Sequence, residues 1–270
     1  MLTSSRLSKR RPFAAPKNRI TGSLATLSAE ECRNDEPIVF KIAAAQSERA
    51  AAFRLVYEAY VQAGLMQPNV FQMRVMPHHL LPTTATFVAQ RGAQVIGTVS
   101  LVGDGRLGLP MERVYGAEID ELRHPSTWLG EVTALASAAM ATDLSFHIVI
   151  GLMRLMAQFA RRHGVEHLLI AVHPRHARFY QRAMGFKPLG GERPYPSVCN
   201  RPAVALRLDL SHLNDAPSAN VALFFDEPIP EAKLPFCPIS AEERRFFAPV
   251  VAYEANVADA ATPGAVLACA

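Results

Sequence analysis

Two apolar runs on either side of one long helical pattern constrain the fold of this chain more than any other feature. The runs are TWLGEVTALAS (127–137) and HLLIAVH (167–173), which have the composition and length of buried strands. Between them, from about Asp143 to His163, apolar residues recur at helical spacing while polar residues occupy another face. A helical crossover of this length joins parallel strands, so the sequence predicts a sheet that contains a parallel pair.

The segments around this unit complete a mixed sheet. Arg91-Gly92 is a turn signal between two strand patterns, which predicts an antiparallel hairpin, and Pro174 and Gly185 mark the two ends of a short helix. The expected elements are strands over 39–45, 84–90, 94–102, 127–137, 167–173, 186–190 and 203–210, helices from Ser47 to Gly64, from Asp143 to His163 and over 174–184, and a loop with short helical pieces over 103–126. This order predicts an α+β fold with a mixed central sheet flanked by helices.

Three zones follow one another along the chain. Residues 1–35 form a basic N-terminal tail that we expect to be flexible, residues 36–213 form the patterned domain, and residues 214–270 form a C-terminal extension. In the extension, Ser240 and Glu243 form a capping-box signature before an apolar run. We therefore expect one or two helices there.

The composition argues against several classes of function. Much of the formal net charge of +4 comes from the first twenty residues, so nucleic-acid binding is not implied. The cysteines lack the spacing of a disulfide framework, which makes a reducing cytoplasm the simplest location. No histidine pair has partner ligands at metal-site spacing, so no metal is expected. Charged residues interrupt the most apolar stretch, 132–160, so we expect no membrane span.

Four segments carry a resemblance to a known family. They are LGEVTALAS (129–137), HPRHARFYQRAMGF (173–186), GERPYP (191–196) and AVALRLDL (203–210). The stretch 167–189 looks like the closing half of the GNAT acyltransferase core. Together the segments resemble the FeeM-like N-acyl amino acid synthases, and the Glu-x-Thr-x-Leu-Ala pattern is also similar to the acyl-homoserine-lactone synthases. The resemblance spans residues 39–210 and implies a GNAT-like sheet and an N-acyltransferase that uses an acyl thioester.

The stretch before the long helix bears on the acyl donor. Acetyl-CoA enzymes of the resembled superfamily have a glycine-rich turn there, whose backbone N–H groups hold the CoA pyrophosphate. SAAMATDLSF (137–146) has no glycine and places Asp143 where a pyrophosphate would be repelled. We therefore expect no bound cofactor and a donor that is the phosphopantetheine thioester of acyl carrier protein, with acyl-CoA as the alternative.

Three side chains are candidates for catalysis. Glu131 lies in an otherwise apolar strand, where burial raises the pKa of a carboxylate, and the resemblance falls on it. It would act as a general base or hold the acceptor ammonium; the structural alternative is an ion pair with Arg54. The resemblance implies that Tyr180 is the general acid near the thioester sulfur, although it could instead be a core aromatic. His173 ends a strand at the edge where open α/β sheets bind ligands, and its other interpretation is a helix cap.

Two further sets of residues are assigned to binding. The candidates for substrate binding are Arg54, Tyr57, Thr133, Leu135, Ile148 and Leu152. Arg54 would pair with an acceptor carboxylate, and the apolar members would contact the acyl chain. The candidates for docking acidic acyl carrier protein are Arg161, Arg162, Arg175, Arg178 and Arg182. Each of these arginines could instead belong to a solvated surface.

The sequence thus predicts a cytoplasmic N-acyl amino acid synthase that takes a medium- or long-chain acyl group from acyl carrier protein. A CoA-dependent GNAT N-acetyltransferase is the alternative enzyme, and a non-catalytic GNAT-like module that binds an acyl ligand or a protein is the alternative outside enzymes. The expected partners are acyl carrier protein and an amino acid or small amine. Contact with a membrane would be peripheral, through the lipid product.

Overall fold

The computed structural model describes residues 36–138, 142–212 and 218–260. The chain divides into two units, Met1–Glu36 and Pro37–Ala270, and all described helices and strands lie in the second. The predicted basic tail, residues 1–35, lies outside the described residues.

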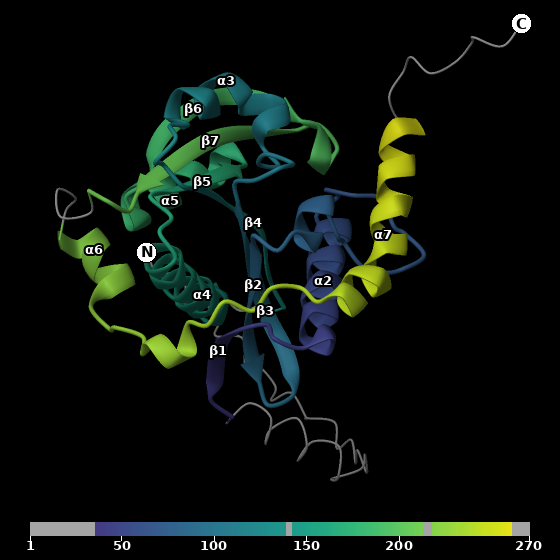
Figure 1. Cartoon of the computed structure of the whole chain (residues 1–270), viewed down its shortest axis with the longest axis horizontal. Helices are drawn as coiled ribbons and strands as arrows, with labels where there is room; N and C mark the ends of the chain where they lie inside the picture. The colour runs from purple at the N-terminus through teal and green to yellow at the C-terminus, as the bar shows by residue number, and fades with distance from the viewer. Residues whose placement is uncertain (1–35, 139–141, 213–217, 261–270) are drawn as a thin grey trace, which may run out of the picture. The chain divides into compact units, whose positions relative to one another are not determined.

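A seven-stranded mixed sheet forms the centre of the second unit (Figure 1). Its strands are β1 (Ile38–Ile42), β2 (Thr84–Arg91), β3 (Gln94–Gly103), β4 (Leu129–Ser137), β5 (His167–Val172), β6 (Lys187–Tyr195) and β7 (Arg201–Asp209), in the order β1-β2-β3-β4-β5-β7-β6. Neighbouring strands are antiparallel except β4 and β5, which are parallel. The predicted hairpin, the predicted parallel pair and the α+β class are confirmed.

Helices cover both faces of this sheet. They are α2 (Gln46–Gln62), α3 (Glu112–Leu122), α4 (Thr142–Arg162), α5 (Pro174–Met184), α6 (Ser218–Phe225) and α7 (Ala241–Ala260), with the 3-10 turns η1 (Pro77–Leu80), η2 (Pro196–Val198) and η4 (Glu231–Lys233). α2 and α4 pack on opposite faces of β2, β3 and β4 (Figure 1). α3 occupies much of the loop expected over 103–126. Its backbone kinks at Tyr115, so the expected short helical pieces are joined there, and burial of Tyr115 and Ile119 holds them to the protein.

The apolar stripe of α4 is buried against the sheet. Ile148 and Leu152 are fully buried, and a Cβ added at Gly97 of β3 would collide with Ile148. By length and composition α4 is apolar enough to cross a membrane, but half of this stretch is buried inside the protein. A core helix has the same length and composition, and α4 contributes to the main hydrophobic cluster.

β4 and β5 separate soon after they begin to pair. Their register has three pairs, from Leu129↔His167 to Glu131↔Leu169, although both strands continue further. Beyond this point the register of β4 against β3 shifts, and Ala134 has a left-handed backbone conformation with φ 53°. Such a bulge bends a strand and increases its twist, so β4 turns away from β5. The sheet therefore has an opening between β4 and β5, with Glu131 where the strands part.

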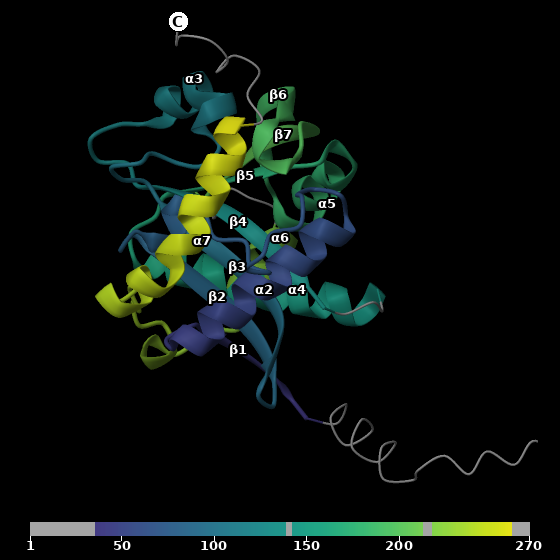
Figure 2. The ribbon, with the colours of Figure 1, turned by 90° about the vertical axis from the view of Figure 1, so that its right-hand side faces the viewer.

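The C-terminal extension connects the two faces of the sheet. On the α4 face, the Gln158 side chain donates to the Phe224 carbonyl (2.7 Å) and accepts from the Ile229 N–H (2.7 Å). On the α2 face, Arg49 donates to the Cys237 carbonyl (2.6 Å). The last helix, α7, then runs beside α2 (Figure 1; Figure 2).

The capping box predicted at the start of α7 is present. The Glu243 N–H donates to Ser240 Oγ (3.1 Å), and the Ser240 N–H donates to Glu243 Oε2 (2.7 Å). Glu243 also pairs with the buried Arg49 of α2. This helix start is therefore fixed both locally and by a contact across the fold.

Candidate active site

Glu131 is a buried carboxylate at the point where β4 and β5 part. It is 2% exposed, and its Oε2 accepts a hydrogen bond from the Met111 N–H at 2.7 Å. Burial raises the pKa of this carboxyl to about 8; the Met111 N–H opposes the rise and the Glu112 carboxylate adds to it. A carboxyl with a pKa near neutrality can take up and release a proton, as a general base must. The alternative ion pair with Arg54 is not formed, because Arg54 is exposed on α2.

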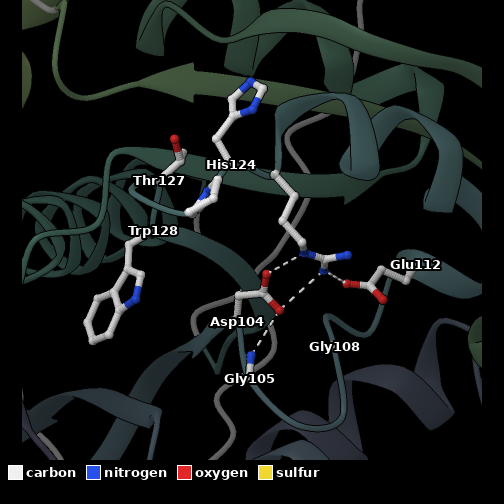
Figure 3. Close-up of a pocket in the computed structure, with 9 residues that line it drawn as sticks. Asp104, Gly105, Gly108, Glu112, His124, Thr127 and Trp128 are labelled. Atoms are coloured by element: carbon white, nitrogen blue, oxygen red, sulfur yellow. Dashed lines mark hydrogen bonds and ion pairs between the residues drawn. The ribbon is translucent and has the colours of Figure 1, made fainter.

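An ion network holds the segment that supplies the Met111 N–H. Arg123 pairs with Asp104 (2.8 Å) and with Glu112, and Glu112 also accepts the Leu109 N–H (2.9 Å). The network lines an open hollow of about 510 Å³, which is completed by Gly105, Gly108, His124, Pro125, Thr127 and Trp128. Figure 3 shows Asp104 and Glu112 directed toward the same guanidinium group. Because these charges are paired with one another, we interpret the hollow as support for the Glu131 site.

Tyr195 lies within electrostatic range of Glu131, and Tyr60 lies within range of Tyr195. Tyr195, at the end of β6, is buried in the same cluster as Met111, and its pKa is raised strongly by burial and further by the Glu131 carboxylate. Tyr60, on α2, packs against the cluster that contains Ala134 of β4 and adds to the rise in the pKa of Tyr195. Their phenol groups therefore provide hydrogen-bonding groups around Glu131 and the opened part of β4.

Tyr180 lies on α5, in the hydrophobic cluster beneath α4. It packs edge-on against Phe179 and Phe186 and is 9% exposed. Burial raises its pKa to about 12, and the phenol of Tyr60 adds to the rise. Tyr60 packs against the cluster of α2 and β4, so Tyr180 lies within electrostatic range of a phenol on that side of the sheet. Tyr180 is thus a core aromatic, and its role as a general acid stays a prediction.

His173 is the N-cap of α5 and follows β5, which ends one residue before the predicted position. Its Nδ1 accepts a hydrogen bond from the Arg175 N–H at 3.2 Å. A cap of this kind satisfies one of the free N–H groups of the first helical turn. The capping interpretation is therefore confirmed, and a catalytic role for His173 stays a prediction.

The candidates for acyl binding fall into two groups. Thr133 and Leu135 lie on the part of β4 that has separated from β5, as contact with a substrate requires. Ile148 and Leu152 lie on α4 and are fully buried in the packed core. An acyl chain would reach these two residues only if the core rearranged.

The five predicted docking arginines are all exposed. Three of them share one face of α5, at spacings of three and four residues: Arg175, Arg178 and Arg182. The other two end α4, which leads into the opposite end of β5 from the end that precedes α5. Both contact the C-terminal extension: Arg161 lies over the Phe225 ring (5.2 Å), and Arg162 pairs with Glu231 (3.1 Å). A docking role for these five arginines stays a prediction.

The stretch that bears on the donor is described only in part. Residues 139–141 of SAAMATDLSF lie outside the described residues, whereas Asp143 is exposed in the first turn of α4. Among the residues that the structure describes, no group of three or more His, Cys, Asp or Glu side chains is arranged to hold a metal ion.

Four groups had no role predicted from the sequence: the Met111 N–H beside Glu131, the phenols of Tyr60 and Tyr195, and Arg74, whose guanidinium lies over the Tyr60 ring. Tyr195 belongs to the GERPYP segment and Tyr60 to a helical pattern, so the sequence indicated their positions but no role. Arg74 lies in the irregular segment between α2 and η1, where no periodicity could place it. Arg54, which was chosen with Tyr57 from helical spacing, is exposed and forms no ion pair with any described residue.

Comparisons with known proteins agree with this architecture. The structure of FeeM, an N-acyl amino acid synthase from uncultured soil microbes, is 28% identical, with a TM-score of 0.60 over 67% of this chain and 95% of that chain. The AHL synthase LasI shares the fold at 14% identity (TM-score 0.54; 72% of this chain and 98% of that chain). So does BjaI, a CoA-dependent acyl-homoserine lactone synthase solved with SAM and isopentyl-CoA, at 17% identity (TM-score 0.54; 69% and 88%). No match was found among curated proteins.

The family model described as N-acyl amino acid synthase FeeM matches residues 51–209. The matched region contains the opening between β4 and β5 together with Glu131, Tyr180 and Tyr195. It excludes the whole C-terminal extension, including α7. The chain is an N-acyltransferase with a GNAT-like fold, and it belongs to the FeeM family of N-acyl amino acid synthases.

Proposed function

We propose that this synthase takes a medium- or long-chain acyl group from acyl carrier protein and joins it to the amino group of an amino acid. The observation that carries the proposal is the opening between β4 and β5, with the buried carboxyl of Glu131 at its base. Beyond Glu131 the two strands do not pair, so a pantetheine arm can lie between them as an added strand would. The thioester would then lie beside Thr133 and Leu135.

In this arrangement Glu131 removes a proton from the ammonium group of the acceptor. The freed amine attacks the thioester carbonyl carbon, a C–N bond forms, and backbone N–H groups of β4 that face the opening stabilise the oxyanion. The C–S bond then breaks, and the thiolate takes a second proton from the nitrogen and leaves as a thiol. One thioester and one amine give one amide and one thiol, and Glu131 returns its proton to solvent.

Tyr180 assists the departure of sulfur by donating a hydrogen bond. Its pKa of about 12 lies well above that of a free thiol, about 8.5, so full proton transfer from the phenol to the thiolate is uphill. A phenol that remains protonated can still stabilise the developing thiolate. We therefore assign the proton of the leaving group to the acceptor nitrogen and the stabilisation of sulfur to Tyr180.

Two observations favour acyl carrier protein over CoA as the donor. SAAMATDLSF (137–146) has no glycine, and Asp143 in the first turn of α4 would repel a pyrophosphate. The arginine face of α5, formed by Arg175, Arg178 and Arg182, belongs to the helix that follows β5 at the opening, where it would attract an acidic carrier. A reducing cytoplasm, where Cys199 and Cys237 would stay free, suits this reaction.

Mass spectrometry of lipid extracts from cells that express the protein tests the acceptor class. We expect amino acids acylated with medium or long chains. Acetylated amines would support a CoA-dependent N-acetyltransferase instead. The absence of any acylated product would support a non-catalytic module.

The donor is tested with the purified protein. We expect acylated carrier protein to support turnover and free CoA to bind poorly, as measured by calorimetry. The same assay should include acyl-CoA as a donor, because BjaI, which shares the fold, is a CoA-dependent synthase. Micromolar binding of free CoA, combined with no turnover from acylated carrier protein, would show that residues 137–146 do not disfavour CoA and that acyl carrier protein is not the donor.

A further inference from the structure

Arg74 has a guanidinium group that is oriented by its neighbours but not neutralised. Its Nη2 donates to the Ser197 carbonyl (2.8 Å), and its guanidinium carbon lies 4.8 Å from the centre of the Tyr60 ring. Within the described residues, no carboxylate lies within ion-pair distance of this group. A guanidinium has five N–H donors, so one bond to a carbonyl leaves most of them available to a ligand.

Two tyrosines, Tyr195 and Tyr60, lie close to Arg74 and relate its position to that of Glu131. Burial raises the pKa of Tyr195, the Glu131 carboxylate adds to the rise, and Arg74 opposes it, so both charged groups lie within electrostatic range of one phenol. Tyr60, which lies against the guanidinium, packs against the cluster that contains Ala134 of β4. Arg74 therefore belongs to the α2 side of the same site as Glu131.

The C-terminal extension supports the segment that carries Arg74. Its sequence neighbours Met73 and Val75 are buried in one cluster with Phe53 of α2 and Phe247 of α7. The Arg74 N–H donates to the Phe53 carbonyl at 3.1 Å. The support is shared, because Phe53 lies within the matched residues 51–209, whereas Phe247 of α7 lies outside them.

The carboxyl of Glu254, on α7, lies within electrostatic range of Arg74. Burial raises this pKa to about 7, and Arg74 opposes the rise. One of its oxygens, Oε1, is buried and has no hydrogen-bond partner among the described residues. Near neutral pH a carboxyl of this kind is partly protonated, so it leaves much of the charge of Arg74 uncompensated.

An amino acid carries a carboxylate next to the amine that is to be acylated. Resting on the function proposed above, we propose that Arg74 binds the carboxylate of the acceptor and thereby directs its amine toward Glu131. A guanidinium suits this task because its parallel N–H donors match the two oxygens of a carboxylate. The acceptor is then an α-amino acid with a free carboxylate, and a simple amine is a poor substrate. Arg74 takes the role that the sequence analysis gave to Arg54.

A pair of acceptors tests this assignment. The amino acid that the wild-type protein acylates best is compared with its carboxamide, which keeps the amine and the side chain but loses the negative charge, using one acylated carrier protein as donor. We expect the wild-type KM to be at least about tenfold higher for the carboxamide. Arg74→Gln should raise the KM for the free amino acid about 10- to 100-fold and leave the KM for the carboxamide nearly unchanged.

Three further variants complete the experiment. Arg245→Gln changes an exposed arginine of α7 and should leave both KM values unchanged. Arg74→Lys should restore part of the preference for the free amino acid, and it provides the same comparison if the glutamine variant does not fold. Arg54→Gln tests the competing arginine, and thermal unfolding shows whether each variant keeps its fold.

The outcomes separate this inference from the proposed function. If the wild-type protein does not prefer the free amino acid, if folded Arg74→Gln keeps the wild-type preference, or if Arg54→Gln removes the preference instead, the assignment of Arg74 is overturned while amino-acid acylation stands. If the wild-type protein acylates no amino acid from any thioester, the proposed function fails and this inference fails with it.

Discussion

Two carboxylates of this protein, Glu131 and Glu243, are buried to a similar extent, but their pKa values are shifted in opposite directions. Glu131 is 2% exposed and Glu243 is 7% exposed. Burial raises the pKa of Glu131, which has the Met111 N–H as a donor, to about 8. Burial acts in the same direction on Glu243, but the Ser240 N–H and the charge of Arg49 outweigh it, so the pKa is lowered. The difference lies in the partners and not in the burial.

The location of each carboxylate explains what its partners do. Glu243 lies where α7 meets α2, and its partners are permanent parts of the protein. Glu131 lies beside the opening between β4 and β5, where a substrate can approach. A buried carboxylate that is fully paired stabilises a fold, whereas one with too few partners at an opening is available for proton transfer. The following predictions test this distinction.

Among the variants considered, loss of the Glu243 carboxylate should have the largest effect, which is a fall in the free energy of unfolding. Glu243→Ala leaves the buried Arg49 guanidinium without its carboxylate and removes the capping box of α7. We expect the free energy of unfolding to fall by about 3–5 kcal/mol, measured by chemical denaturation. Glu242→Ala, at the exposed neighbouring position, is the control and should change it by less than about 0.5 kcal/mol. Equal losses in the two variants would mean that the buried pair is not what stabilises this junction.

Loss of the Glu131 carboxylate should instead affect catalysis. Glu131→Gln keeps the size of the side chain and an acceptor for the Met111 N–H, but it removes the proton acceptor. Turnover should fall by about a hundredfold or more while the protein remains folded, because the loss of a general base typically has an effect of this size. Thiol release from the acyl donor measures the rate. A folded variant with a near wild-type rate would remove Glu131 from the mechanism.

The raised pKa of Glu131 predicts a pH dependence of the rate. The value of kcat/KM should rise about tenfold per pH unit up to about pH 8 and then level off, because only the deprotonated carboxylate accepts a proton. In the pH profile of kcat/KM for Glu131→Gln, the only rise left should be the one caused by deprotonation of the acceptor's ammonium group. Identical profile shapes for the two proteins would contradict the assignment of the base.

The two carboxylates should also affect stability with opposite signs of pH dependence. The folded pKa of Glu131 is about 8 against an ordinary value of 4.5, so the stability that it contributes is present below pH 4.5 and is lost as the pH rises through 8. The pKa of Glu243 is lowered, so its contribution is present above pH 4.5 and is lost as the pH falls through its folded value. Denaturation series of the wild-type protein, Glu131→Gln and Glu243→Ala should separate the two trends.

The framework of the fold was predictable because it depends on local patterns. The long helix between two apolar runs required the parallel pair of β4 and β5, and Pro174 and Gly185 marked the ends of α5, where Gly185 has φ 76°. The burial of Glu131 was predictable for the same reason, since it lies in an otherwise apolar strand, and its catalytic role stays a prediction.

The rest of the site depends on contacts between distant segments. Arg74 gains its position from the packing of its neighbours against α2 and α7, and no pattern in residues 65–76 indicates this. Arg161 and Arg175 are close in sequence, but they adjoin opposite ends of β5, which only the order of elements in space reveals. Helical spacing suggested Arg54 because it identifies residues on a face without identifying what that face contacts.

The smallest expected effect concerns charge at the surface, where water and salt weaken each interaction. Reversal of two charges on the arginine face, Arg175→Glu with Arg178→Glu, should raise the KM for acylated carrier protein about tenfold and leave transfer from a short acyl-pantetheine thioester unchanged, because only docking is altered. The matched control, Arg113→Glu with Arg245→Glu, reverses two exposed arginines on α3 and α7 and should change neither value. Added salt should raise the wild-type KM for the carrier but not that of the α5 variant, because screening weakens both the attraction in the wild-type protein and the repulsion that the two glutamates introduce. Equal losses with both donors would place Arg175 and Arg178 in the active site, and unchanged use of the carrier would place docking on another surface.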